Sequence, residues 1–187
     1  MKSKKEFSAQ YPLERNTVNI FGVIDDDMAE RVIAQLQYLE DNGAEEITIQ
    51  INSPGGSVSA GFAIYDMIRF VNCPVVLVGN GLIASAAALI LLAVPKERRV
   101  GFANSEYLIH QPLSGMRGTA TEIVIHAENL TKTKAKINKI IAEATGKDFK
   151  QVEKDTDRDH WLDAEEAKEY GLIGKIITSR NELKEIK

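Results

Sequence analysis

The side chains in this sequence that could catalyse an acyl transfer are a serine and a histidine. Three histidines are available as a general base: His110, His126 and His160. His110 follows a short predicted strand at 107–109, and loops at strand ends usually form the sites of open α/β sheets. A lone histidine there is more often structural, while His126, inside a predicted long helix, is typical of a surface or interface residue. The position of His110 alone therefore does not identify it as a general base.

Ser85 is the candidate nucleophile. It follows a glycine-containing segment, 79–81, that predicts a turn, and a small apolar helix is predicted over 84–92. Backbone N–H groups at a helix start favour negative charge, which develops on the carbonyl oxygen during acyl transfer. A second glycine turn, 52–56, follows the preceding strand, so we expect the Gly56 N–H to be able to face Ser85. Alone, Ser85 is more typical of a buried serine in an alanine-rich helix, and the G-x-S-x-G pattern is absent.

The segments before His110 alternate between strand and helix patterns. Strands are predicted at 17–21, 47–51 and 75–78. Asp27 and Glu30 predict a capping box at the start of the first helix, and further helices are predicted after the turn at 52–56 and around Ser85. This order predicts an α/β fold with a parallel sheet and right-handed crossovers.

The pattern changes after His110. A glycine-punctuated arm, 113–118, is predicted to be extended, and Thr119 and Glu122 predict a capping box for a long helix that runs to Gly146. This helix is expected to be either an appendage that packs on a partner or a solvated helix on the sheet; the pattern alone leaves both open. The remaining predictions are a short helix, capped by Asp163 and Glu166 and ended by Gly171, and a last strand through Ile173, Ile176 and Ile177.

Composition narrows the class of protein. The net charge is −4 with no basic block, which argues against nucleic-acid binding. The longest apolar run, 86–94, is too short to cross a bilayer, which needs about 20 residues, and no secretory signal is present. A single cysteine, Cys73, is typical of a small core residue and fits a reducing compartment. These features predict one domain over 1–187 in the cytoplasm, with no metal or cofactor, since no ligand cluster has metal spacing.

Taken together, several segments resemble the proteolytic subunit of the Clp protease family, in order and spacing, over roughly residues 11–180. They are Asn52-Ser53-Pro54-Gly55-Gly56, Ala84-Ser85, Asn104-Ser105-Glu106, Ile109-His110-Gln111-Pro112, Ala120-Thr121-Glu122-Ile123, Asp155-Thr156-Asp157-Arg158-Asp159, Asp163-Ala164-Glu165-Glu166-Ala167 and Glu169-Tyr170-Gly171-Leu172-Ile173.

The resemblance implies a serine endopeptidase with a Ser-His-Asp triad. Position by position, it assigns Ser85 as the nucleophile, His110 as the general base and Asp159 as the acid that orients the imidazole. It also implies that the backbone N–H groups of Gly56 and Ala86 form the oxyanion hole.

The resemblance further implies the fold and the assembly. The fold is the ClpP/crotonase-like α/β spiral, and 111–146 is the family's handle, which interlocks two heptameric rings into a hollow tetradecamer. Asp157 and Arg158 match the ring-to-ring contact. A hexameric AAA+ ATPase feeds unfolded polypeptides into such a chamber, and a paralogous proteolytic subunit is a further possible partner.

Two features depart from the family pattern. Ala86-Ala87 stands where the family usually has Met-Gly. Ala86 still supplies a backbone N–H, but Ala87 in place of glycine is expected to alter the local packing and the neighbouring pocket. The segment before Tyr11, residues 1–10, is expected to be short and flexible, which predicts altered ATPase docking and gating and a divergent paralogue.

Two other functions stay open from sequence. One is a non-catalytic structural or regulatory subunit of a mixed Clp barrel. The other is a crotonase-type acyl-CoA enzyme, which would use oxyanion N–H groups with a carboxylate such as Glu106 or Glu122 and would leave Ser85, His110 and Asp159 unexplained. Labelling by a fluorophosphonate separates both from an active serine peptidase.

Overall fold

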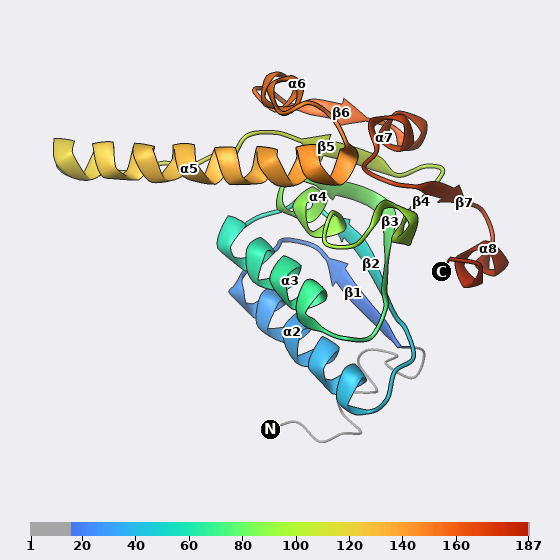
Figure 1. Cartoon of the computed structure of the whole chain (residues 1–187). Coiled ribbons are helices and arrows are strands. Elements are labelled where there is room, and N and C mark those ends of the chain that lie inside the picture. Colours follow the sequence, from blue (N-terminus) through green and yellow to red (C-terminus); the bar gives the residue numbers. More distant parts are fainter. Residues whose placement is uncertain (1–15, 187) are drawn as a thin grey trace.

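The computed structural model describes residues 16–186 of this 187-residue chain, so the predicted N-terminal segment 1–10 lies outside the described residues (Figure 1). Its strands are β1 (Thr17–Phe21), β2 (Ile47–Ser53), β3 (Val75–Ala84), β4 (Arg99–Phe102), β5 (Glu106–Ile109), β6 (His160–Leu162) and β7 (Lys175–Ile177). Its helices are α2 (Asp26–Asp41), α3 (Val58–Phe70), α4 (Ala86–Leu91), the 3-10 turn η2 (Lys96–Arg98), α5 (Ala120–Thr145), α6 (Phe149–Asp155), α7 (Ala164–Tyr170) and α8 (Arg180–Lys184).

The strands form one mostly parallel sheet, as predicted, in the order β1-β2-β3-β4-β7. Alternate residues of β3 face opposite sides. Val75 and Leu77 join the main core beneath α2, α3 and α4, whereas Val76 and Val78 join a small cluster beside α8. The two faces of the sheet are therefore covered very unequally (Figure 1).

The predicted turn at 79–81 is wrong, because β3 continues through it to Ala84. The first half of β3 pairs with β4, the second half pairs with β5, and the register against β2 shifts between the two halves. The glycines serve packing instead of chain reversal. A methyl group on Gly79 would lie 2.6 Å from the Tyr107 hydroxyl, and one on Gly101 would overlap that hydroxyl. Gly81, with φ +92°, lies where the register shifts.

We expect Gly101→Ala to lower the thermal unfolding midpoint, because the added methyl meets the buried Tyr107 phenol. Overpacking of this kind costs about 1–3 kcal/mol. Tyr107→Phe in the same chain removes the overlapping oxygen, so the double variant should regain most of the loss. Gly115→Ala is the matched control, since nothing lies within 4 Å of the position where its methyl would stand. Equal midpoints for Gly101→Ala and Gly115→Ala would contradict this account of the packing.

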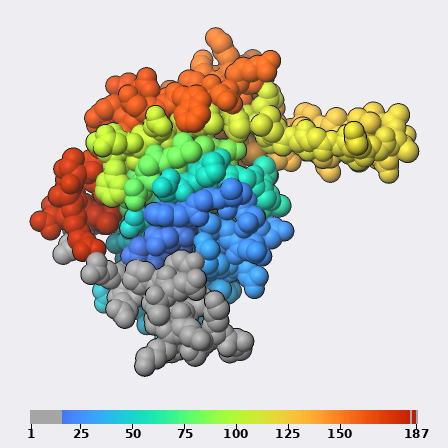
Figure 2. Space-filling model, turned by 180° about the vertical axis from the view of Figure 1, so that it is seen from behind, coloured from blue at the N-terminus to red at the C-terminus, as the bar shows by residue number. Residues whose placement is uncertain are grey.

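The helix α5 is the longest element, and both of its predicted ends are confirmed. Thr119 and Glu122 form the capping box, and Gly146 ends the helix with φ 74°. Hydrogen bonds from the Thr119 backbone and hydroxyl lower the pKa of Glu122. Only the C-terminal part of α5 is anchored to the body, and the N-terminal half projects away from it (Figures 1 and 2).

The anchored end of α5 is held by both apolar and polar contacts. Ile141 is buried in the main core, and the buried Arg99 donates a 2.7 Å hydrogen bond to the Ala144 carbonyl. Burial lowers the pKa of Arg99 to about 10, so the guanidinium remains charged at neutral pH. The projecting half instead exposes apolar side chains, namely Ile123, Val124 and Ile125. The N-terminal half of α5 therefore projects from the body and does not lie on the sheet.

Other helix boundaries correct the sequence predictions. Asp25, not Asp27, caps α2, with its carboxylate accepting from the Met28 N–H. The capping box of Asp163 and Glu166 on α7 is confirmed.

Among residues 16–186, no helix is both long and apolar enough to cross a membrane.

Candidate active site

Ser85 lies at the junction of β3 and α4 in an unusual backbone conformation. Its φ of 57° and ψ of −121° make it one of two non-glycine residues with positive φ in the described chain. Such conformations persist only where the surroundings impose them. The Ser85 N–H donates to the Leu108 carbonyl at 2.9 Å, and Gly55 packs so closely that a methyl there would lie 2.7 Å from the Ser85 Cβ. This sharp strand-to-helix turn carries the hydroxyl on its outside, as in a nucleophile elbow.

The structure brings Ser85, His110 and Asp159 into one hydrogen-bonded series. His110 Nε2 lies 2.8 Å from the Ser85 Oγ, and His110 Nδ1 lies 3.0 Å from the Asp159 Oδ1. The His110 side chain is 14% exposed and the Asp159 side chain 63% exposed, so the base is shielded while the acid is open to solvent in the isolated chain.

Strand register explains why three residues so far apart in sequence meet. Ala84 pairs with Leu108 in the parallel β3–β5 ladder, so Ser85 and His110 leave adjacent strands at the same edge. Ile109 pairs with His160 in the antiparallel β5–β6 ladder. The next opposed positions in that ladder are His110 and Asp159. The short strand β5 therefore aligns the base with both of its partners.

The Gly56 N–H is directed away from Ile24, a residue between β1 and α2. Ile24 forms a parallel bridge with Gly56, in which the Ile24 N–H binds the Gly55 carbonyl and the Ser57 N–H binds the Ile24 carbonyl. In such a bridge the groups of the flanking residues face the partner and those of the central residue face the other way. The Gly56 N–H is thus turned away from Ile24, and the adjacent Gly55 packs against Ser85. Ala86, the first residue of α4, presents its N–H at the helix start.

A small apolar pocket adjoins Ser85 and His110. Its lining comes from α3, α4, α5 and the residue before the arm: Val58, Ala86, Leu89, Ile137 and Pro112. Ala86 contributes only a methyl group where the family usually has methionine. Ala87, from which a change in this pocket was expected, is fully buried and is not among the residues that line it.

The other histidines are outside the series. His126 Nε2 lies 2.7 Å from the Ser114 Oγ, which links α5 to the arm, and His160 packs on the Tyr170 ring at 5.6 Å. Of the two residues predicted to contact the other ring, the Arg158 side chain is 92% exposed. The Asp157 Oδ1 lies 3.3 Å from the Lys134 Nζ of α5.

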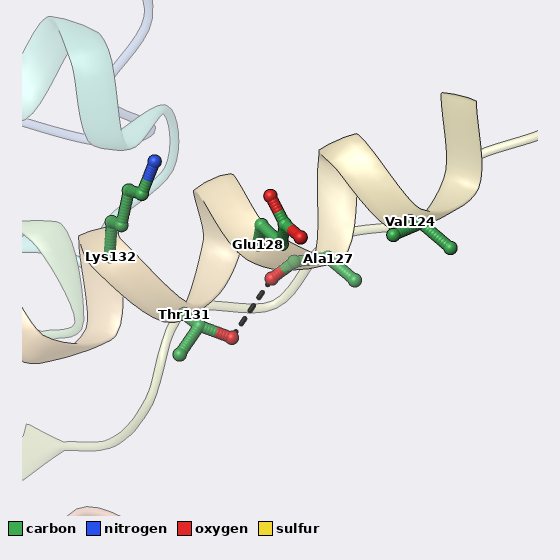
Figure 3. Close-up of a pocket in the computed structure, with 5 residues that line it drawn as sticks. All are labelled: Val124, Ala127, Glu128, Thr131 and Lys132. Atoms are coloured by element: carbon green, nitrogen blue, oxygen red, sulfur yellow. Dashed lines mark hydrogen bonds between the residues drawn. The ribbon is translucent and has the colours of Figure 1, made fainter. Parts of the chain in front are cut away.

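A hollow on the projecting part of α5 is separate from this site. It is lined by residues of that one helix, Val124, Ala127, Glu128, Thr131 and Lys132, and the Thr131 hydroxyl donates back to the Ala127 carbonyl at 2.9 Å (Figure 3). None of the three residues in the hydrogen-bonded series lines it, so it offers no alternative catalytic centre.

The parallel sheet, the serine on its strand-to-helix turn and the hydrogen-bonded histidine and aspartate define the class of protein as a serine peptidase. The family model described as Clp protease matches residues 3–180. The chain therefore belongs to the Clp protease family, as a proteolytic subunit.

Similar proteins agree with this assignment. The chain is 55% identical over 174 residues to the ATP-dependent Clp protease proteolytic subunit 2 of Treponema denticola, covering 92% of this chain and 87% of that protein. It is 46% identical over 167 residues to the proteolytic subunit 3 of Rhizobium etli, covering 89% and 86%. A solved Listeria monocytogenes ClpP1 with an asparagine-to-aspartate substitution has a TM-score of 0.87 and 44% identity, covering 94% of this chain and 98% of that chain.

Proposed function

We propose that this subunit hydrolyses polypeptides with Ser85 as nucleophile, His110 as general base and Asp159 as the orienting acid. The observation that carries the proposal is the position of His110, hydrogen-bonded to Ser85 through Nε2 and to Asp159 through Nδ1. A neutral imidazole with its proton on Nδ1 donates to Asp159 and leaves Nε2 free to accept the serine proton.

The reaction follows from this geometry. Ser85 Oγ attacks the scissile carbonyl carbon while its proton moves to His110 Nε2, and the carbonyl oxygen takes up the negative charge. The N–H groups of Gly56 and Ala86 donate to that oxygen. The tetrahedral intermediate collapses, the C–N bond breaks, and the proton on His110 passes to the leaving amine. Water then attacks the acyl-enzyme by the same route, which restores Ser85.

Both alternatives from sequence are less well supported. Glu122 is engaged in the capping box of the projecting helix α5, and Glu106 is exposed at the start of β5, at the end of that strand away from His110. A non-catalytic subunit would have no need for three side chains held at 2.8 and 3.0 Å.

The apolar pocket beside Ser85 further suggests that the substrate presents an apolar side chain to it.

The assembly we propose is two heptameric rings held together by segment 111–146, with the active sites facing an inner chamber. Support comes from the projecting α5 with its exposed Ile123, Val124 and Ile125, because contiguous apolar surface marks interaction sites. We further propose that a hexameric AAA+ ATPase supplies unfolded chains, that a paralogous proteolytic subunit shares the particle, and that the protein acts in the cytoplasm.

Fluorophosphonate labelling tests the catalytic assignment. The purified particle is incubated with the probe, digested, and the modified residue identified by mass spectrometry, while native mass spectrometry gives the subunit number of the labelled species. We expect one label per subunit, on Ser85. An assembled particle that takes up no label would refute the proposal and favour the non-catalytic subunit.

We expect Arg158→Ala to produce smaller particles with little peptidase activity. Arg158 is almost fully exposed and lies one residue from Asp159, so a contact made by its guanidinium across rings would also fix the loop that holds the acid. Species are separated by size and each is assayed with a short fluorogenic peptide. Arg180→Ala is the matched control, since Arg180 is an exposed arginine at the start of α8, outside segment 111–146 and the 155–159 loop. Full specific activity in single rings or monomers would show that assembly does not control the site.

A further inference from the structure

The segment that precedes Asp159 is tied directly to the residue that follows His110. The Gln111 N–H donates to the Thr156 carbonyl at 2.7 Å, and the Gln111 side-chain Nε2 donates to the Asp157 carbonyl at 2.6 Å. Two hydrogen bonds from one residue therefore set the separation of the chain segments that carry the base and the acid. The position of residues 156–157 against Gln111 therefore governs where Asp159, two residues further on, lies relative to His110.

The same segment is tied on its other side to α5 through a buried polar contact. Thr156 is fully buried at the end of α6, and its Oγ1 lies 2.9 Å from the Oδ1 of Asn138, which is 1% exposed on α5. Four residues earlier on α5, the Lys134 Nζ lies 3.3 Å from the Asp157 Oδ1. Two side chains one helical turn apart thus hold the loop before Asp159 against α5.

Hydrogen-bond chemistry decides how the Asn138 amide is oriented. The Thr156 hydroxyl also lies 2.9 Å from the Val152 carbonyl, but it has a single proton and cannot donate to both oxygens. The buried Asn138 Nδ2 has no partner within the described residues when the amide is placed with its oxygen toward Thr156. With the amide turned over, Nδ2 donates to Thr156 and Thr156 donates to Val152, and the amide oxygen takes the position that has no partner within the described residues. The contact is then a directed chain from α5 through Thr156 to α6.

We propose that Asn138 and Thr156 are positioning residues for the reaction: their buried contact transmits the placement of α5 to Asp159, and through Gln111 to His110. The proposal rests on the triad described under the proposed function. Neither residue touches substrate, so neither is catalytic. Loss of the contact should loosen the alignment of Asp159 with His110 while leaving the apolar pocket at Ser85 intact, because neither side chain lines it.

Thr156→Val tests the contact, since valine keeps the shape of threonine and removes the hydroxyl. We expect kcat to fall by about 10²-fold with KM for a short peptide unchanged, the scale expected when a remote change misplaces reacting groups. Thr156→Ser restores the hydroxyl and should restore kcat. Thr145→Val is the matched control, because it removes a hydroxyl that bonds to the Ile141 carbonyl elsewhere on α5. It should leave kcat unchanged.

A double variant separates positioning from stability. In Thr156→Val with Asn138→Leu, both partners become apolar, which leaves no buried polar group unpaired and should recover the thermal midpoint lost in Thr156→Val. The connection between α5 and the loop stays absent, so kcat should remain low. Recovery of kcat together with the midpoint would overturn the proposal, as would a wild-type kcat in Thr156→Val. Failure of wild-type particles to label at Ser85 would instead count against the proposed function.

Discussion

Ser85→Ala should abolish peptide hydrolysis while leaving the particle assembled. Alanine keeps the Cβ that packs against Gly55 and removes only the oxygen that lies 2.8 Å from His110 Nε2. Removal of the nucleophile from a triad lowers kcat by roughly 10⁴–10⁶-fold. Turnover of a fluorogenic peptide by size-selected particles, with the labelling reaction as a second measurement, gives the result.

Ser59→Ala provides the comparison, because Ser59 is an exposed serine on α3 whose hydroxyl binds Ser57 and not the site. It should retain the activity and the label of the unaltered chain. Near-normal turnover by pure Ser85→Ala particles would show that another residue is the nucleophile.

Asp159→Asn should slow acylation strongly without unfolding the protein. The asparagine amide can donate to His110 Nδ1, which places the imidazole proton on Nε2 and prevents that nitrogen from accepting the serine proton. The corresponding change in other triads costs about 10⁴-fold. The Asp159 side chain is 63% exposed in the isolated chain, so solvent screens its charge. The loss of about 10⁴-fold is therefore an upper bound for Asp159→Asn.

The measurement is the rate constant for Ser85 labelling, which reports the attack step without product release. Asp66→Asn is the control, since Asp66 is an exposed carboxylate on α3 outside the site. The assignment of Asp159 would be wrong if assembled Asp159→Asn particles labelled as fast as the control.

Several helix ends were predicted correctly where the signal lies in residues next to one another in the sequence. The capping boxes at Thr119 and Asp163 and the stop at Gly146 need only neighbouring residues, and all three are present. The site residues were named from a resemblance, and their meeting depends on the pairing of β5 with both β3 and β6. No single segment contains that information, so periodicity alone cannot supply it.

The wrong and missing predictions concern features that neighbouring residues do not determine. Gly79 and Gly81 suggested a turn because glycine favours turns locally, but Gly79 provides room for the Tyr107 phenol, which comes from a strand nearly thirty residues later. The short strands β4 and β6 and the helix α6 were not predicted, since three to seven residues carry too little pattern. Likewise, Asn138 and Thr156 give no sign in sequence that they meet.

The projecting helix α5 can finally be considered as a lever. The helix is anchored at its buried end near Asn138 and Ile141. Its length from Asn138 to Ala120 is about 27 Å at ~1.5 Å per residue. A force applied at the tip acts through this length, whereas Asn138 holds the loop before Asp159 close to the anchored end. If rings meet at this tip as proposed, a small force there would exert a large torque on the buried end that contacts Thr156.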